Sequence, residues 1–429
     1  MAGGLMQIVA YGAQDVYLTG NPQITFFKVV YRRHTNFAHE AIEQTFNGQA
    51  DFGRRVTTTI ARNGDLIHKC YLQATLPALE ATTGCFRWVD HVGHHLIKQV
   101  EVEIGGQRVD RQYGDWLQIW YDLTLEPGHR HALGHGYDDM IGQGDADIET
   151  SLQSDEVSHE AYTLYVPLQF WFCRNAGLAL PLIALQYHEV KINLDFRAYE
   201  DLLITGNDNQ GQAFSGWATT PALVSASLWV EYVYLDTEER RRFAQVSHEY
   251  LIEQLQFTGE EAVTANATTY KAKLSFNHPV KELIWVAQDE KHINLNQWSN
   301  YTDMVANFKE NCFDPSTTTQ RALNPVTTSK LQLNGQDRHA TRDGRYFNLV
   351  QPYQHHTNIP ESPGINVYSF ALKPEEHQPS GSANFSRIDN ATLNLGLIGS
   401  DQGYKVRVYA VSYNVLRIMS GMGGTAYSN

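Results

Sequence analysis

Residues 101–111 read EVEIGGQRVDR, and residues 330–338 read KLQLNGQDR. In both stretches apolar and polar side chains alternate, and a two-residue turn (Gly-Gly or Asn-Gly) follows before Gln. Alternation is the pattern of a strand with one buried face, and both dipeptides favour the tight turn of a hairpin. The chain therefore carries one hairpin signal twice, which predicts a duplicated β domain.

Four further pairs of segments recur in the same order in the two halves of the chain. They are FNGQA (46–50) with FTGEE (257–261), residues 65–77 with 282–288, residues 182–196 with 385–397, and residues 227–235 with 404–413. Any two β domains can align this loosely, so the alternative of two unrelated domains stays open. The order favours an all-β fold of two consecutive eight-stranded antiparallel jelly-roll sandwiches with a few short helices.

A length of 429 residues suits two domains of this kind. We expect an N-terminal arm over 1–23, a first jelly roll over 24–236 and a second over 237–429. The second begins with a helical linker, because residues 236–256 contain good helix formers without Gly or Pro. Residues 115–125 are the other predicted helix, and residues 26–37 are predicted to be the first strand.

Two further strand patterns make specific predictions about turns and faces. Residues 55–76 alternate on both sides of Asn63-Gly64, which predicts a hairpin turn there. Near the end of the chain, the pattern predicts an inward face that includes Val406 and Val408. Lys405 and Arg407 would then lie on the outward face.

Charge and cysteine content exclude several classes of protein. The formal net charge of −14 argues against sequence-independent binding of DNA, and the short basic runs at Arg32–Arg33, Arg54–Arg55 and 240–242 fit local ion pairs. The N-terminus lacks the pattern of a secretory signal, and Pro and Arg interrupt the most apolar window, residues 164–187. Four scattered cysteines make a disulfide framework unexpected and suit a reducing compartment.

The histidine-rich stretch 126–139 is the strongest candidate for a metal site. It contains His129, His131, His135, Asp138 and Asp139. A cupin-like metal site would need a rigid strand with a following Glu, whereas glycines surround these histidines. The pair His94 and His95 would point to opposite faces of a strand. We therefore expect no metal ligands.

No other motif points to catalysis or to a cofactor. The glycine-rich end of the chain lacks the Lys and Ser/Thr of a phosphate-binding loop, and no GxSxG motif occurs. We expect no catalytic residue, no cofactor and no enzymatic activity. Four Asn-x-Ser/Thr sequons give candidate glycosylation sites, at Asn266, Asn300, Asn384 and Asn390.

Five long blocks carry a resemblance to a known family. They are residues 12–38 (GAQDVYLTGNPQITFFKVVYRRHTNFA), 103–120 (EIGGQRVDRQYGDWLQIW), 235–254, 352–389 and 413–429. These blocks resemble the major capsid proteins of nucleocytoplasmic large DNA viruses, and the algal-virus branch is the most similar. Their order and spacing fit that family from one end of the chain to the other.

The resemblance implies a structural protein with a double jelly roll. It also implies homotrimeric, pseudo-hexagonal capsomers that tile an icosahedral shell in the virion, assembled in the host cytoplasm. The implied partners are neighbouring capsomers and minor capsid and penton proteins, with no direct contact to nucleic acid. An internal membrane would lie beneath the shell, and insertions such as residues 127–160 would form outward loops.

Two other function classes remain as alternatives. A jelly-roll lectin is compatible with the aromatic content of 11%. A cupin-like metalloenzyme would require the histidine-rich stretch to bind metal. A trimer in solution would favour the capsid protein. Saturable glycan binding by a monomer would favour the lectin, and metal retained through dialysis would favour the metalloenzyme.

Overall fold

The computed structural model describes residues 3–23, 31, 34–80, 86–129, 136–142, 158–205, 220–304, 308–309, 312–313, 322–360 and 362–427. The chain forms two compact units, Met1–Phe37 and Ala38–Asn429. The first unit contains α1 (Gly3–Val9), η1 (Ala13–Asp15) and α2 (Val16–Thr19). The second unit, called the body below, contains the sheets.

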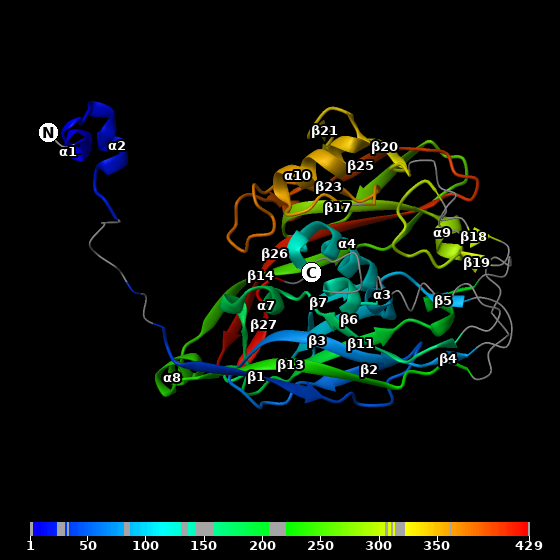
Figure 1. Cartoon of the computed structure of the whole chain (residues 1–429), viewed down its shortest axis with the longest axis horizontal. Helices are drawn as coiled ribbons and strands as arrows, with labels where there is room; N and C mark the ends of the chain where they lie inside the picture. The colour runs from blue at the N-terminus through cyan, green and yellow to red at the C-terminus, as the bar shows by residue number, and fades with distance from the viewer. Residues whose placement is uncertain are drawn as a thin grey trace. The chain divides into compact units, whose positions relative to one another are not determined.

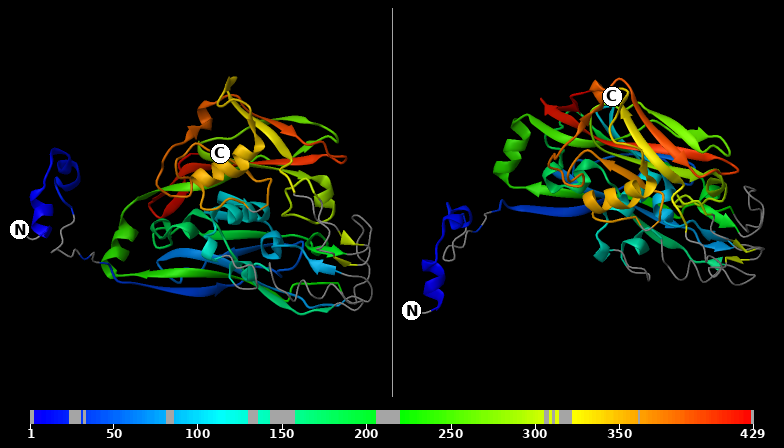
Figure 2. Two further views of the ribbon diagram at one scale, coloured as in Figure 1. Left: turned by 45° about the horizontal axis from the view of Figure 1, so that its top comes forward. Right: turned by 90° about the horizontal axis from the view of Figure 1, so that it is seen from above.

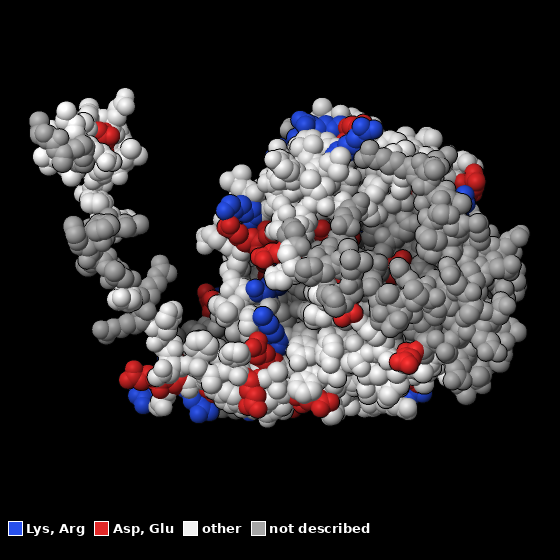
Figure 3. All heavy atoms as spheres, viewed as in Figure 1, with Lys and Arg blue, Asp and Glu red and all other residues white. Residues whose placement is uncertain are grey.

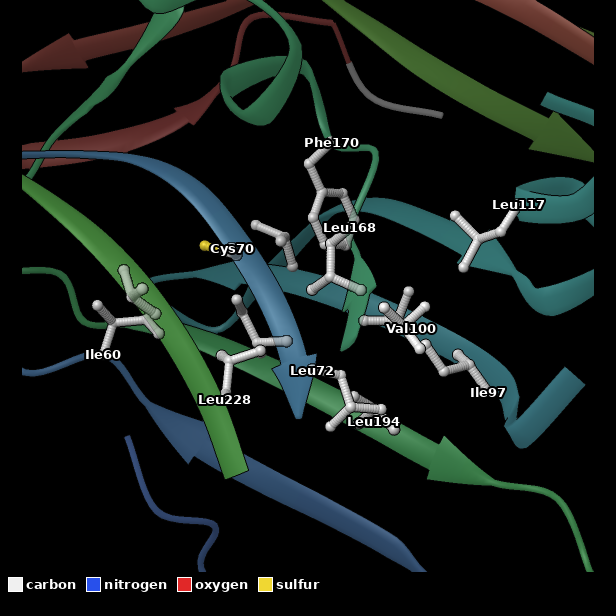
Figure 4. Close-up of a cluster of buried hydrophobic side chains, with 14 of the residues drawn as sticks. Ile60, Cys70, Leu72, Ile97, Val100, Leu117, Leu168, Phe170, Leu194 and Leu228 are labelled. Carbon is white, nitrogen blue, oxygen red and sulfur yellow. The ribbon is translucent and has the colours of Figure 1, made fainter. Parts of the chain in front are cut away.

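The first sandwich of the body has two facing sheets (Figure 1). One sheet has the order β1 (Phe37–Gln44), β13 (Ser225–Leu235), β3 (Leu66–Leu76) and β10 (Leu180–Pro181), with β9 (Tyr162–Pro167) also paired to β3. The other has the order β2 (Arg55–Thr59), β11 (Val190–Phe196), β6 (Ile97–Ile104) and β7 (Gln107–Tyr113). Inward side chains such as Leu72, Val100 and Leu194 are fully buried between the sheets (Figure 4).

The second sandwich repeats this arrangement. Its larger sheet has the order β14 (His248–Phe257), β26 (Tyr404–Met419), β17 (Pro279–Asp289) and β23 (Asn366–Ser369), with β15 (Glu261–Val263), β24 (Ala383–Asn384) and β27 (Met422–Thr425) at its margins. The facing sheet has the order β16 (Thr269–Leu274), β25 (Ala391–Leu397), β20 (Val326–Leu333) and β21 (Gln336–Asp337), with β22 (Arg342–Asp343) also paired to β20.

Short helices and strands of two or three residues complete the described part of the chain. The helices are α3 (Val92–Leu96), α4 (Gly114–Thr124), α5 (Tyr137–Met140), α7 (Trp171–Arg174), α8 (Thr237–Gln245), α9 (Glu290–Asn294), η6 (Tyr346–Val350) and α10 (Gln351–His355), with single turns η2 (Pro127–His129), η4 (Ala176–Leu178), η5 (Tyr199–Leu202) and η7 (Phe385–Arg387). The remaining strands are β4 (Leu79–Glu80), β5 (Phe86–Trp88), β8 (Ser158–His159), β12 (Leu203–Thr205), β18 (Phe308–Lys309) and β19 (Cys312–Phe313).

The two halves share their strand order and their turns. The order β2-β11-β6-β7 corresponds to β16-β25-β20-β21, and β1-β13-β3 corresponds to β14-β26-β17. The two hairpin turns that suggested the duplication have the same backbone, with φ of 57° and 84° at Gly105 and Gly106 and of 50° and 80° at Asn334 and Gly335. The predicted double jelly roll is therefore confirmed.

Two local predictions were wrong. Asn63-Gly64 does not close a hairpin, because β2 and β3 belong to opposite sheets and pair with β11 and β13. The predicted helix over 236–256 ends at Gln245, and β14 follows it. Ten residues of β14 pair with β26, so tertiary pairing overrides the helix propensity of this segment.

The predicted first strand lies mostly outside the described residues. Of the residues 26–37, the structure describes Tyr31 and 34–37, and β1 begins only at Phe37. The predicted helix over 115–125 is present as α4, with a start one residue earlier.

The two ends of the sandwiches carry different elements of secondary structure. The short strands β4, β5, β18 and β19 lie at one end of the sandwiches, whereas α8 and the hairpin of β26 and β27 lie at the other (Figures 1 and 2). Residues 127–160, which the resemblance assigns to an outward loop, end with β8, and most of them lie outside the described part of the chain.

The repeated turn gives the first testable prediction. A Cβ at Gly106 would meet no atom within 4 Å, but φ there is +84°. We expect Gly106→Ala to lower the free energy of unfolding by about 1 kcal/mol through backbone strain alone. Gly128→Ala is the matched control, because its Cβ would also meet nothing and its φ is not positive. Urea unfolding of both variants measures the difference, and equal midpoints would contradict the assignment of the turn.

Candidate functional site: junction and assembly surfaces

The junction between the sandwiches is built on β17 and β26, which are covered on both faces. Alternate residues such as Trp285 and Val408 join the core of the second sandwich. The residues between them pack against α4 of the first sandwich in a separate apolar cluster. That cluster contains Trp116, Ile119, Trp120, Leu123, Ile284, Val286, Tyr301, Ile365, Val367, Tyr409 and Val411. The two sandwiches therefore bury an apolar interface and belong to one compact unit.

The cores also exchange residues across the junction. Ile252 of β14, with Leu416 and Ile418 of β26, packs in the core of the first sandwich. The edge strands β7 and β14 add polar contacts, because the Leu255 amide donates to Asp110 Oδ1 at 3.0 Å and Gln254 donates to the Val109 carbonyl. Burial raises the pKa of Asp110 to about 7, although the hydrogen bond from the Leu255 amide lowers it.

A polar cavity of about 390 Å³ opens between the same two edge strands. Arg108 and Arg111 contribute to its lining from β7, and Gln254 and Gln256 contribute from β14. Both arginines are already paired with Glu101, with N–O distances of 3.5 and 2.5 Å. Both arginines share this one carboxylate, so the pairing compensates only part of their positive charge.

Arg407 is the central charge of the junction. Its side chain is 2% exposed and lies 3.6 Å from Asp115 Oδ2 at the start of α4. Its Nε donates to Glu260 at 2.8 Å, and its Nη1 donates to Gln288 at 2.8 Å. Burial alone would raise the pKa of Asp115, but the Arg407 guanidinium, the His95 hydrogen bond and Arg197 hold it well below its usual range. The pair is charged and spans both sandwiches.

A second buried group of charges surrounds Lys281. Its ammonium lies 2.7 Å from Glu253, which also binds Arg174 of α7 at 3.1 Å. The next residue, Glu282, lies 2.9 Å from His356 Nε2, and His356 Nδ1 lies 2.9 Å from Glu375. Burial alone would lower the pKa of His356, but the two carboxylates raise it to about 9. These groups compensate one another and have no open face for a substrate.

The sequence interpretation missed both groups. Arg407 was assigned to an outward face, and the structure buries it because that face covers the first sandwich. Lys281 and Glu282 interrupt the apolar strand PVKELIWVAQD, of which every residue after Pro279 is buried. A charged dipeptide inside such a run was the one available signal of a buried ion pair.

The structure separates the residues of the histidine-rich stretch. His131 and His135 lie outside the described residues, and His129 is exposed beside Glu126. Asp138 is buried in α5 and accepts a hydrogen bond from the Tyr121 hydroxyl, while Asp139 accepts one from Tyr162. In the described part of the chain, no three His, Cys, Asp or Glu side chains form a group that could hold a metal ion.

His94 and His95 were predicted to point to opposite faces of a strand, and this prediction was wrong. They lie in the short helix α3 rather than in a strand. His94 contacts Gln118 Oε1 at 2.8 Å and the Tyr137 hydroxyl at 3.1 Å, and His95 Nε2 contacts Ser299 at 2.8 Å. Burial lowers the pKa of both and brings that of His94 to about 3. They are neutral polar anchors between α3, α4 and their neighbours.

One arginine of each described basic run is engaged in an ion pair. Arg55 binds Glu101 at 2.7 Å, and Arg240 of α8 binds the buried Asp65 at 2.9 Å. Arg32–Arg33 lies outside the described residues. On the face drawn in Figure 3, the described Lys and Arg side chains form small groups beside Asp and Glu.

The four sequons differ in how free their asparagines are. Asn266, Asn384 and Asn390 are exposed. The Asn300 amide instead donates to Gln297 and Met304 at 2.9 Å each and accepts from Thr302. Its side chain holds a turn, so a glycan there would require that turn to open.

Two groups of exposed apolar side chains offer surfaces for assembly. The α10 patch consists of Leu349, Val350, Tyr353 and Leu372, of which Tyr353 is 75% exposed and Leu372 is 72% exposed. The hairpin patch consists of Tyr187, Met419 and Met422 around the turn between β26 and β27. Such patches on a charged surface mark contacts with other proteins.

No described helix is both long enough and apolar enough to cross a membrane.

Family models match almost the whole chain. The model described as "Major capsid protein N-terminus" matches residues 25–236, and the model described as "Large eukaryotic DNA virus major capsid protein" matches residues 239–424. The major capsid protein of Pyramimonas orientalis virus is 53% identical, and that of Paramecium bursaria Chlorella virus 1 is 43% identical. Both alignments cover 100% of this chain and 100% of the relative.

Solved structures agree with the sequence comparison. A chain of "PBCV-1 virus capsid, quasi-atomic model" is 40% identical and superposes with a TM-score of 0.78 over 94% of this chain and 100% of its own length. The Faustovirus major capsid protein is 14% identical, with a TM-score of 0.71 over 97% of this chain and 96% of its own. The second likeness supports the fold alone.

The junction gives a prediction about buried charge. Asp115→Asn removes one of the two carboxylates that face the buried Arg407, while Glu260 stays at 2.8 Å. We therefore expect the free energy of unfolding to fall by about 3 kcal/mol, the low end of the range for breaking a buried ion pair. Glu376→Gln breaks the exposed pair with Lys373 and is the control, with no measurable change expected. Urea unfolding at pH 7 compares the two, and an Asp115→Asn variant as stable as the wild type would contradict the role of this pair.

The buried histidine gives a prediction about pH. Unfolded His94 takes up a proton below about pH 6.5, whereas the folded residue does so only near pH 3. The folded state thus loses stability as pH falls through this window, by up to about 1.4 kcal/mol per pH unit for this group. His94→Gln should therefore cost less stability at pH 5 than at pH 7.

Urea midpoints between pH 5 and 8 measure that difference. The exposed His129 supplies the control, because His129→Gln should keep the pH dependence of the wild type. If His94→Gln and the wild type show parallel pH profiles, His94 does not titrate as proposed.

Proposed function

This chain belongs to the major capsid protein family of large eukaryotic DNA viruses, and from that premise we propose that it assembles as a homotrimeric, pseudo-hexagonal capsomer of an icosahedral shell. It is a structural component of the virion capsid and not an enzyme.

The rigid duplication carries the trimer proposal. Each chain presents two sandwiches with the same strand order, fixed to each other by the apolar cluster around α4. Three chains around a cyclic axis place six sandwiches in a ring, which gives a hexagonal outline while the two kinds of sandwich make unlike contacts. A flexible link between the sandwiches would not hold this outline.

The α10 patch supports a contact between copies. Leu349, Val350 and Tyr353 project from consecutive turns of η6 and α10, and the His355 ring contacts the Leu372 carbonyl at 3.0 Å, so Leu372 lies beside them. We assign this patch to the trimer interface. An obligate interface of this kind buries roughly 2,000 Å² or more and is relatively apolar.

The division of the chain remains part of the proposal. We assign residues 1–23 to an arm, 24–236 to the first jelly roll and 237–429 to the second. The family models end and begin at 236 and 239, and Asp236 caps α8 by accepting from the Thr237 amide at 2.6 Å, which supports this boundary. Exposed apolar residues of the first unit, such as Ile8 and Tyr17, support an arm that binds other proteins of the shell.

The remaining partners are proposed from the family alone. We expect contacts with minor capsid and penton proteins, an internal membrane beneath the shell, no direct contact with nucleic acid, and assembly in the host cytoplasm. Of the sequons, we favour Asn266, Asn384 and Asn390 as glycan sites over Asn300, because only the first three are exposed.

Light scattering on the purified chain tests the trimer. Three copies of 48.6 kDa give a mass of about 146 kDa, which we expect across the micromolar range. Tyr353→Glu places a charge in the α10 patch and should shift the mass toward the monomer. Val224→Glu is the control, because Val224 is also exposed (63%) and lies outside the α10 patch. A folded wild-type monomer would overturn the proposal and favour the lectin alternative.

A further inference from the structure

Two of the four cysteines meet in the first sandwich. Cys70 lies in β3 and Cys173 in α7, more than a hundred residues apart in the chain. The sequence interpretation treated all four cysteines as isolated. The structure instead packs Cys173 against the same apolar cluster that contains Cys70.

The backbone on both sides of the pair holds the two segments together. The Leu168 amide donates to the Cys70 carbonyl at 2.9 Å, and His68 Nδ1 contacts the Phe172 carbonyl at 2.6 Å. The Cys173 amide donates to the Phe170 carbonyl at 2.9 Å, which fixes the start of α7. Figure 4 shows Cys70, Leu168 and Phe170 in one group of side chains. Cys173 therefore lies beside the segment of β3 that carries Cys70, in the same cluster of side chains.

The two thiols differ in access. Cys70 is buried, whereas Cys173 is partly exposed. The hydrogen bond from Cys173 and burial both raise the pKa of the Cys70 thiol. Cys173 is thus the thiol that a reagent from solvent reaches first, and Cys70 is the resolving thiol behind it.

We propose that Cys70 and Cys173 are a dithiol site that closes to an intrachain disulfide when the protein meets a small disulfide oxidant. The Cys173 thiolate attacks one sulfur of the oxidant, which forms a mixed disulfide and releases one thiolate. Cys70 loses its proton and attacks the Cys173 sulfur, which forms the Cys70–Cys173 bond and releases the second thiolate. Two protein thiols are oxidised, and one oxidant disulfide is reduced to two thiols.

Closure would fasten a segment that connects the sandwiches. Arg174 follows Cys173 directly, binds Glu253 of β14 at 3.1 Å and lies over the Trp120 ring at 4.9 Å. A bond from Cys173 to β3 would tie that arginine to the central strand of the first sandwich. The two thiols stay reduced in a compartment that lacks disulfide oxidants and form the disulfide in an oxidising compartment. The site lies within one chain, so it is independent of capsomer assembly.

Thiol counting on the full-length chain tests the site. In a Cys85→Ser, Cys312→Ser background only Cys70 and Cys173 remain. After incubation with oxidised and reduced glutathione at fixed ratios, maleimide labelling under denaturing conditions should detect two thiols in reducing buffer and none in oxidising buffer. Peptide mapping without reductant should recover the cross-linked pair. Two free thiols in the most oxidising buffer, or glutathione retained on Cys173, would overturn the proposal.

A stability measurement supplies a second readout. The cross-link closes a long loop of the unfolded chain, so the oxidised background protein should have a higher urea midpoint than the reduced protein. Adding Cys173→Ser at the partly exposed position should abolish this redox dependence. If oxidation does not change the urea midpoint of the Cys85→Ser, Cys312→Ser protein, that result would count against a closed, unstrained disulfide.

Discussion

The sheet that contains β17 and β26 is covered on both faces, by its own partner sheet on one side and by α4 of the first sandwich on the other. A strand in this position cannot direct its polar residues to water. Each charge on its second face must therefore find a partner inside the protein, because an unpaired buried charge costs several kcal/mol (roughly 3–5). Arg407 meets this constraint with Asp115, Glu260 and Gln288, and Lys281 meets it with Glu253.

The same coverage makes two sandwiches into one rigid body. Ile252 from β14 completes the core of the first sandwich, and Trp116 and Trp120 from α4 pack on the second. Because each half supplies part of the other's buried surface, neither has a complete apolar interface alone. A shell built from such units inherits a fixed angle between unlike sandwiches, which is the property that a pseudo-hexagonal capsomer needs.

The sequence predicted features that depend on local chemistry, and it missed those that depend on what covers a strand. The Gly105-Gly106 and Asn334-Gly335 turns were predictable because their positive φ angles require such residues. The inward face of β26 was predictable from period two, but the burial of Arg407 was not, since alternation cannot tell a solvated face from one covered by another domain. The helix predicted over residues 248–257 and the hairpin turn predicted at Asn63-Gly64 were wrong for a related reason. Strand pairing across the chain decided both, and local propensity carries no information about the partner strand.

The charges in the junction do more for specificity than for stability. An apolar contact such as that of Trp116 with Tyr409 is non-directional and would tolerate a shift of one sandwich along the other. A buried ion pair gains little over an apolar pair of the same size, but breaking it is costly. A shift that separated Arg407 from Asp115 would break the ion pair that joins the two sandwiches, although Arg407 would keep Glu260 and Asp115 would keep Arg197. The apolar cluster would lose only part of its contact in the same shift. The hydrophobic surface thus holds the sandwiches together, and the buried charges select the one register in which they are held.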